Sequence, residues 1–122
     1  MKNEEFNTVI EKQLQICKDI LCKKANEYAR DEDRLHNFKC AAGLLCCDPK
    51  EALCGMMVKH TVSVADMCRD EVDHPLDLWE EKITDSINYL LLLKALVIED
   101  KCTANACWPV FFAENLKTEE LK

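Results

Sequence analysis

Apolar side chains recur along this chain at steps of three and four residues, which is the spacing of one face of an α-helix. The first such run begins near Glu4 and ends at Tyr28. Its apolar face is made of Phe6, Ile10, Leu14, Cys17, Leu21, Ala25 and Tyr28. The pattern therefore predicts a first helix over residues 4–28.

Two polar breaks predict where a second and a third helix begin. The charged run 30–33 interrupts the apolar pattern and offers an N-cap for a short second helix. Its inner face would carry Leu35, Phe38, Ala42 and Leu45. The third helix has Asp48 as N-cap, Pro49 as its first residue and Glu51 three positions after the cap. We expect this helix to continue to about Asp70.

A fourth helix follows the pair His74-Pro75, because the residue before a proline avoids the α region and breaks the preceding helix. Asp77 is its expected cap, and the helix should run from Leu78 to about Glu99. Its side chains are apolar almost all round, which is typical of a buried helix.

Composition supports a purely helical fold. The 122 residues include only two glycines and three prolines, too few for the tight turns of a β-sandwich or barrel. The length is that of one domain, so we expect a single domain over residues 1–122. The expected architecture is a compact all-α bundle of four main helices with a C-terminal aromatic tail. That tail contains Trp108, Phe111 and Phe112, which would close the core or form a subunit contact in an oligomer.

Charge and cysteine content narrow the class of protein. The formal net charge of −7 repels a phosphate backbone, so duplex DNA or RNA is not an expected partner. The nine cysteines are an odd number, with no signal peptide and no CxxC spacing, which favours reduced structural thiols over disulfides or zinc. No apolar run approaches the roughly 20 residues of a membrane span. We expect a cytoplasmic protein with no membrane partner.

The most informative feature of the fourth helix is a polar stripe. Glu81, Asp85 and Asn88 fall within about 60° of one another on a helical wheel. The stripe either faces solvent, which is common, or lines a pocket or metal site. Two carboxylates one turn apart can share a hard cation such as Mg²⁺.

Two other groups of polar residues are candidate partners of this stripe. The third helix carries a polar stripe of its own, made of Lys59, Ser63, Asp66 and Asp70. His60 lies on the opposite, apolar side of the same helix, where a histidine is commonly a hydrogen-bonded core residue. The segment before the second helix carries Tyr28, Arg34, His36, Asn37, Phe38 and Lys39. Aromatic rings can stack a base and arginine can grip a phosphate, whereas the alternative is a capped turn with both rings in the core.

Three blocks of this sequence, 28–39, 56–60 and 79–89, resemble the small helical nucleotide-modification-associated domain of phages and prophages. The resemblance covers about residues 18–98. The last block is also similar to the ExxD element of the all-α nucleotide pyrophosphatases of the MazG and dimeric dUTPase type. That likeness implies Mg²⁺-dependent hydrolysis of a nucleotide. The chain departs from it, because Lys59 and Ser63 stand where a facing carboxylate cluster is expected.

The favoured hypothesis is a homo-oligomeric protein, in the cytoplasm of a host bacterium, that sequesters a nucleotide. The resemblance suggests a cyclic-dinucleotide-like immune signal, held without cleavage and without a cofactor. The predicted ligand-binding residues are Tyr28, Arg34, Asn37, Phe38, Lys39, Lys59, His60, Ser63, Asp85, Asn88 and Tyr89.

Two alternatives stay open. In an Mg²⁺-dependent pyrophosphatase, Glu81 and Asp85 would bind the metal and Asp66 would join them in catalysis. The other alternative is a helical adaptor protein with no small ligand.

Overall fold

The computed structural model describes residues 1–28 and 33–105. They form four helices: α1 (Asn3–Tyr28), α2 (His36–Leu45), α3 (Pro49–Arg69) and α4 (Leu76–Asn105). No β-strand occurs in these two ranges. The predicted all-α class with four main helices is confirmed, whereas the aromatic residues of the tail lie outside the described residues.

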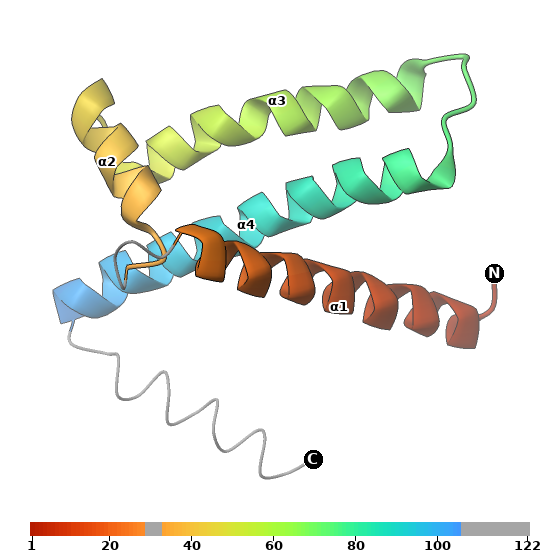
Figure 1. Ribbon diagram of the computed structural model, residues 1–122, viewed down its shortest axis with the longest axis horizontal. Helices are drawn as coiled ribbons and strands as arrows, with labels where there is room; N and C mark the ends of the chain where they lie inside the picture. The colour runs from red at the N-terminus through yellow and green to blue at the C-terminus, as the bar shows by residue number, and fades with distance from the viewer. Residues whose placement is uncertain (29–32, 106–122) are drawn as a thin grey trace, which may run out of the picture.

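The helices pack around α4, the longest of them (Figure 1). α3 and α4 run in opposite directions and make the most extensive contact between helices. α2 packs on α3, and α1 packs on α4. The N-terminal half of α1 diverges from α4, so α1 contacts the rest of the bundle mainly through its C-terminal half (Figure 1).

The predicted helix starts follow from local hydrogen bonds. The side chain of Asp48 accepts a hydrogen bond from the backbone N–H of Lys50 at 2.8 Å, with Pro49 in the first turn, as the sequence predicts. α4 begins at Leu76, directly after Pro75, whose carbonyl accepts hydrogen bonds from the N–H groups of the next turn. The prediction that Asp77 caps a helix starting at Leu78 is therefore wrong, since Asp77 lies in the first turn of α4. α4 also continues past Glu99 to Asn105, because no helix breaker stands between them.

The core lies where α2, α3 and α4 meet. Leu35, Phe38, Leu53 and Leu96 form a buried cluster, and Leu53 is completely inaccessible to solvent. The prediction that Leu45 belongs to this core is wrong, since 67% of its surface is exposed. α2 ends at this residue, and the next one, Cys46, adopts a left-handed conformation with φ 53°.

The apolar face of α1 is only partly buried. Cys17 is 1% exposed, and near it Gln13 Nε2 donates a hydrogen bond of 2.8 Å to Thr84 Oγ1 on α4. Phe6 is 53% exposed and Leu14 is 56% exposed, so this part of the predicted apolar face is not covered by the described residues. The helical period was therefore predicted correctly, but among the described residues no helix covers the N-terminal half of this face.

The cysteines are mostly free thiols. These are Cys17, Cys22, Cys40, Cys46, Cys47, Cys54 and Cys68. The prediction of reduced cysteines is wrong for Cys102, which is disulfide-bonded. Among the described helices, none combines the length and the apolar character needed to cross a membrane.

Candidate functional site

A pocket of about 210 Å³ opens over the middle of α4. It is lined by Leu21, Arg34, Asn37, Phe38, Met56, Asp85, Asn88, Tyr89 and Leu92, so that all four helices contribute to it. We call it the α4 pocket. Six of its lining residues are among those predicted from the sequence to bind a ligand: Arg34, Asn37, Phe38, Asp85, Asn88 and Tyr89.

The polar stripe of α4 runs from solvent into this pocket. The side chain of Glu81 is 63% exposed and lies outside the pocket, 3.7 Å from the ammonium of Lys82. The side chain of Asp85, one turn on, is 27% exposed, and Asn88 as a whole is only 6% exposed. Each of the two interpretations of the stripe therefore holds for one part of it. Glu81 faces water, whereas Asp85 and Asn88 line the pocket.

The contacts of α4 with α1 and with α3 determine where the side chain of Asn88 lies. Thr84 accepts the hydrogen bond from α1, and Asp85 faces His60 of α3. Asn88 follows one turn later on the strip between these two contacts, because residues three and four apart share a helix face. Its Oδ1 is buried and has no hydrogen-bond partner in the part of the chain that the structure describes. An unpaired buried polar group costs about 1–3 kcal/mol, so this oxygen is a specific anomaly of the pocket.

His60 supports two of the lining residues from behind. Its Nδ1 lies 3.6 Å from Oδ2 of Asp85. Its ring centroid lies 4.8 Å from that of Tyr89, with the two planes tilted by 33°. Burial raises the pKa of the Tyr89 phenol, and the nearby charge of Asp85 raises it further. Tyr89 is therefore a neutral aromatic wall that can also donate a hydrogen bond.

The start of α2 supplies the remaining polar groups. Arg34 and Asn37 are both exposed at the pocket, whereas Phe38 is 8% exposed and belongs to the core as well as to the lining. Arg34 has no hydrogen-bond or ion-pair partner among residues 1–28 and 33–105. A guanidinium at the pocket that makes no ion pair with a described carboxylate is available to an anion.

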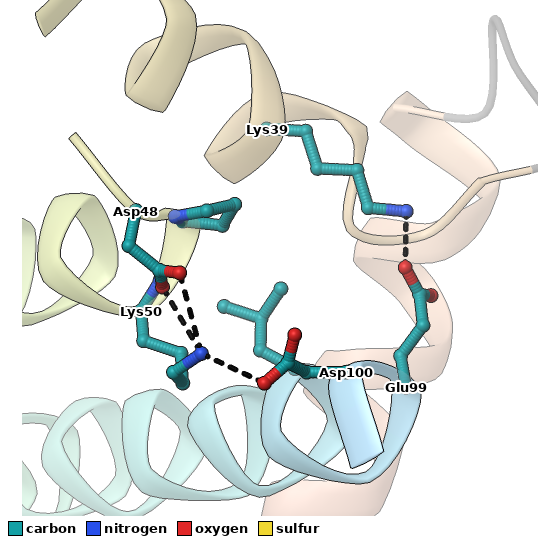
Figure 2. Close-up of a pocket in the computed structure, with 7 residues that line it drawn as sticks. Lys39, Asp48, Lys50, Glu99 and Asp100 are labelled. Carbon is teal, nitrogen blue, oxygen red and sulfur yellow. Dashed lines mark hydrogen bonds and ion pairs between the residues drawn. The ribbon is translucent and has the colours of Figure 1, made fainter. Parts of the chain in front are cut away.

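Lys39 was predicted to bind ligand, but the structure places its ammonium away from the α4 pocket. It lies 2.6 Å from Asp33 and 2.5 Å from Glu99, in the ion pair that Figure 2 shows between α2 and α4. The hydrogen bonds to Asp33 and then to Glu99 raise the pKa of Lys39. Its charge is therefore compensated within the fold.

Figure 2 shows a second hollow, of about 200 Å³, where this ion pair stands beside another one. Lys50 lies 3.2 Å from both Asp48 and Asp100, which ties the start of α3 to the last part of α4. Each lysine here contacts two carboxylates, so the hollow has no uncompensated cation. We interpret it as a set of ion pairs between helices.

The other predicted residues lie outside the α4 pocket. Lys59 and Asp66 are exposed on α3, Ser63 is half-buried, and His60 stands behind the pocket without lining it. The stripe of α3 therefore does not line the pocket, and the α3 residue that contacts the stripe of α4 is His60, through Asp85. Tyr28 ends α1, and its side chain lies outside the described part of the chain.

The carboxylates that the pyrophosphatase hypothesis requires do not come together. Glu81 is exposed, Asp66 is exposed on another helix, and Asp85 faces a histidine. Within residues 1–28 and 33–105, no group of three or more His, Cys, Asp or Glu side chains could hold a metal ion. The donor set does not fit Mg²⁺, and we derive no chemical step through it.

Sequence reasoning missed the apolar part of the lining and the contact that positions α1. The pocket is also lined by Leu21, Met56 and Leu92, and nothing in the spacing of these apolar residues indicates a hollow. Gln13 carried a usable signal, since it is a polar residue whose neighbours on the helix face, Ile10 and Cys17 among them, are apolar; Thr84 has polar neighbours and carried none.

The chain matches no protein-family model, no curated protein and no solved structure in the three comparisons. The resemblance to the phage domain family stays a prediction, and the function is argued below from the pocket itself.

Proposed function

We propose that this protein binds a nucleotide in the α4 pocket and holds it without cleaving it. The observation that carries the proposal is that, among the described residues, one pocket contains a buried amide oxygen with no hydrogen-bond partner, on Asn88, and a guanidinium that makes no ion pair, on Arg34. A nucleotide offers what both groups lack, because its base carries N–H donors and its phosphate carries negative charge.

The remaining lining suits a planar base. Tyr89 and Phe38 provide ring surface, and Leu92 and Met56 provide apolar surface. Pockets for small ligands are usually mostly apolar with a few polar groups that fix orientation, and this pocket has that composition. Asn37 stands next to Arg34 along the rim and adds an amide that can bond a ribose or phosphate oxygen.

The size of the pocket limits how much ligand one chain encloses. Pockets that enclose a drug-sized molecule usually measure about 300–1,000 Å³, whereas this one measures about 210 Å³. It is therefore suited to one base with part of its sugar and phosphate. A cyclic dinucleotide would need two such pockets, which favours a homo-oligomer.

The exposed face of α1 is the surface that we propose for that second copy. Phe6, Val9, Ile10 and Leu14 are 41–56% exposed on the diverging half of the helix. Contiguous apolar patches of this kind on soluble proteins commonly mark interaction sites. Leu21, which lines the α4 pocket, belongs to the same predicted helix face, so a partner seated on α1 would lie beside the pocket.

Holding is favoured over hydrolysis because the pocket has a donor and acceptor set but no grouped carboxylates for a metal-bound water. Asp85 is the one carboxylate in its lining. In this account Asp85 contacts the base and takes no part in bond cleavage.

The test is recovery of the ligand. The full chain is incubated with nucleoside triphosphates and with cyclic dinucleotides, with and without Mg²⁺, then heat-denatured, and the released ligand is analysed by chromatography. Unchanged ligand, together with a raised melting temperature before release, supports the proposal. Released pyrophosphate or monophosphate would establish hydrolysis instead, and the absence of any melting shift would leave no nucleotide function.

Matched arginine variants locate the site. Arg34→Ala should weaken nucleotide affinity about tenfold or more, because it removes a charge-assisted bond to phosphate. Arg69→Ala, at the exposed last turn of α3, should leave affinity unchanged. Equal losses in the two variants would point to nonspecific attraction of the anion.

Light scattering after size exclusion tests the oligomer. The wild-type chain should elute as a dimer or larger species, and Leu14→Glu should shift it to the mass of one chain. Leu44→Glu, at a leucine that is 87% exposed on α2, is the matched control. A monomeric wild type would rule out the α1 interface.

A further inference from the structure

We infer that the base read in the α4 pocket is guanine, through the edge of that base that carries two adjacent N–H donors. This inference rests on the proposed function, since it assigns the base within the same pocket.

The first acceptor is the carboxylate of Asp85. The side chain is 27% exposed and lines the pocket, and its Oδ2 lies 3.6 Å from Nδ1 of His60. The other oxygen, Oδ1, makes no hydrogen bond with the described residues, so it can accept one from a ligand. An ionised carboxylate is an acceptor at both oxygens, so it matches a ligand that presents donors and repels one that presents a lone pair.

The second acceptor is Oδ1 of Asn88, one turn further along the same face of α4. This oxygen is buried in the free protein, and rotation about the terminal side-chain torsion, which has broad minima, would turn it toward the pocket. Two acceptors at positions i and i+3 then point to the same volume. A ligand with donors on adjacent atoms would satisfy both, and it would give a partner to an oxygen that lacks one in the free protein.

The common bases differ in the arrangement of hydrogen-bond donors along the edge that would face Asp85 and Asn88. Guanine places the N1–H and the N2 amino group side by side, which gives two donors for a carboxylate and a further N–H for Asn88. Adenine and cytosine each place a ring nitrogen lone pair beside their amino group, and uracil places one N–H between two carbonyl oxygens. Each of these three bases would turn a lone pair toward Asp85, and a site built for hydrogen bonding rejects such mismatches strongly.

The rest of the pocket is compatible with a guanine whose N1–H and N2 amino edge faces Asp85 and Asn88. Tyr89, stacked on His60 and adjacent to Asp85, offers a ring face next to the acceptor pair. Arg34 comes from the segment that leads into α2, on a different element from the acceptors. The base edge and the phosphate of one nucleotide are likewise at different ends of the molecule.

The test is calorimetric titration of the full chain with guanosine, inosine and adenosine 5′-monophosphates. Guanosine monophosphate should bind at least tenfold more tightly than adenosine monophosphate. Inosine monophosphate, which keeps N1–H but lacks the amino group, should fall between them. Equal binding of all three, or tighter binding of adenosine monophosphate, overturns the inference but leaves the proposed function standing. Binding of none of them, and of no other nucleotide, overturns both.

A pair of carboxylate variants assigns the preference to its residue. Asp85→Asn keeps the shape of the side chain but replaces one acceptor with a donor, so the preference for guanosine over adenosine monophosphate should fall to near parity. Glu81→Gln makes the same change of charge one turn earlier, outside the pocket, and should retain the preference. The melting temperature of each variant shows that it is folded before titration. An undiminished guanine preference in folded Asp85→Asn would overturn the role of Asp85.

Discussion

The imidazole Nδ1 of His60 lies 3.6 Å from Oδ2 of Asp85, and this contact joins α3 to α4 directly behind the candidate pocket. The same imidazole stacks on Tyr89, so one side chain of α3 orients two lining residues of α4. Apart from Arg34, which precedes α2, the described lining residues of the pocket therefore lie on helices. Side chains held in this way need little reordering when a ligand binds, which favours affinity.

The core predicts which leucine matters most for stability. Leu53 is 0% exposed at the centre of the buried cluster, so Leu53→Ala should lower the free energy of unfolding by about 2–5 kcal/mol. Leu44→Ala, at a residue that is 87% exposed, should change it by less than about 0.5 kcal/mol. Urea unfolding followed by circular dichroism measures both. A loss below about 1 kcal/mol for Leu53→Ala would show that this packing is wrong.

Asn88 should show a conflict between stability and binding. Asn88→Leu replaces an unpartnered buried amide with an apolar side chain of similar size, so the free energy of unfolding should rise by about 1 kcal/mol. The same variant should lose nucleotide binding, because the acceptor is gone. Asn7→Leu, on the exposed part of α1, should change neither quantity. Destabilisation by Asn88→Leu would mean that Oδ1 has a partner in the folded protein.

The docking of α1 can be tested by a double-mutant cycle. Gln13→Ala and Thr84→Val remove the two ends of a 2.8 Å hydrogen bond in which Thr84 is 1% exposed. Their coupling in the free energy of unfolding should be about 0.5–1.5 kcal/mol. The exposed Gln15–Asp19 bond on the same helix should give a coupling below about 0.5 kcal/mol. If both pairs couple equally weakly, α1 does not dock on α4 through Gln13.

The ion pair of Asp33 and Lys39 predicts a pH dependence. The hydrogen bond from Lys39, followed by that from the Leu35 N–H, lowers the pKa of Asp33 below 3.8. A lowered folded-state pKa stabilises the fold above the unfolded value, and this contribution is lost as the pH falls through the folded value. Asp33→Asn should therefore be less stable than wild type at pH 7, by less than about 1 kcal/mol, because both side chains are more than a third exposed.

Urea unfolding of wild type and Asp33→Asn at pH 7 and at several values below pH 3.8 measures this difference. The two proteins should converge in acid. A gap that persists in acid would assign the effect of the substitution to its altered shape and not to the charge of Asp33.

Much of the fold was predictable because its signals are local. The cap at Asp48, the proline at position 49 and the break at Pro75 each fix a helix boundary through bonds within a few residues. Leu45 and Phe6 were harder, since their exposure depends on where another helix ends or diverges. The helical period of the apolar residues predicts which face of a helix is apolar, but it does not predict what covers that face.

The location of the candidate site could be predicted from the sequence more fully than the set of residues that line it. Asp85 and Asn88 were distinctive because polar groups on a buried helix need partners. Lys39 was assigned to the ligand for its charge, but sequence could not show that Asp33 and Glu99 already compensate it. The role of His60 depends on which face of α3 meets α4, and a single helical pattern does not specify that pairing.

The most direct test of the pocket is a titration of the isotope-labelled chain with guanosine monophosphate, followed through side-chain NMR signals. The amide of Asn88 is assigned with the Asn88→Asp variant, and the guanidinium of Arg34 with Arg34→Lys. Both signals should shift together and saturate at one affinity, while the ammonium of Lys50, in the second hollow, stays in place. Shifts confined to Lys39 and Lys50, or no shift at Asn88 while the nucleotide binds, would contradict the assignment of the α4 pocket as the binding site.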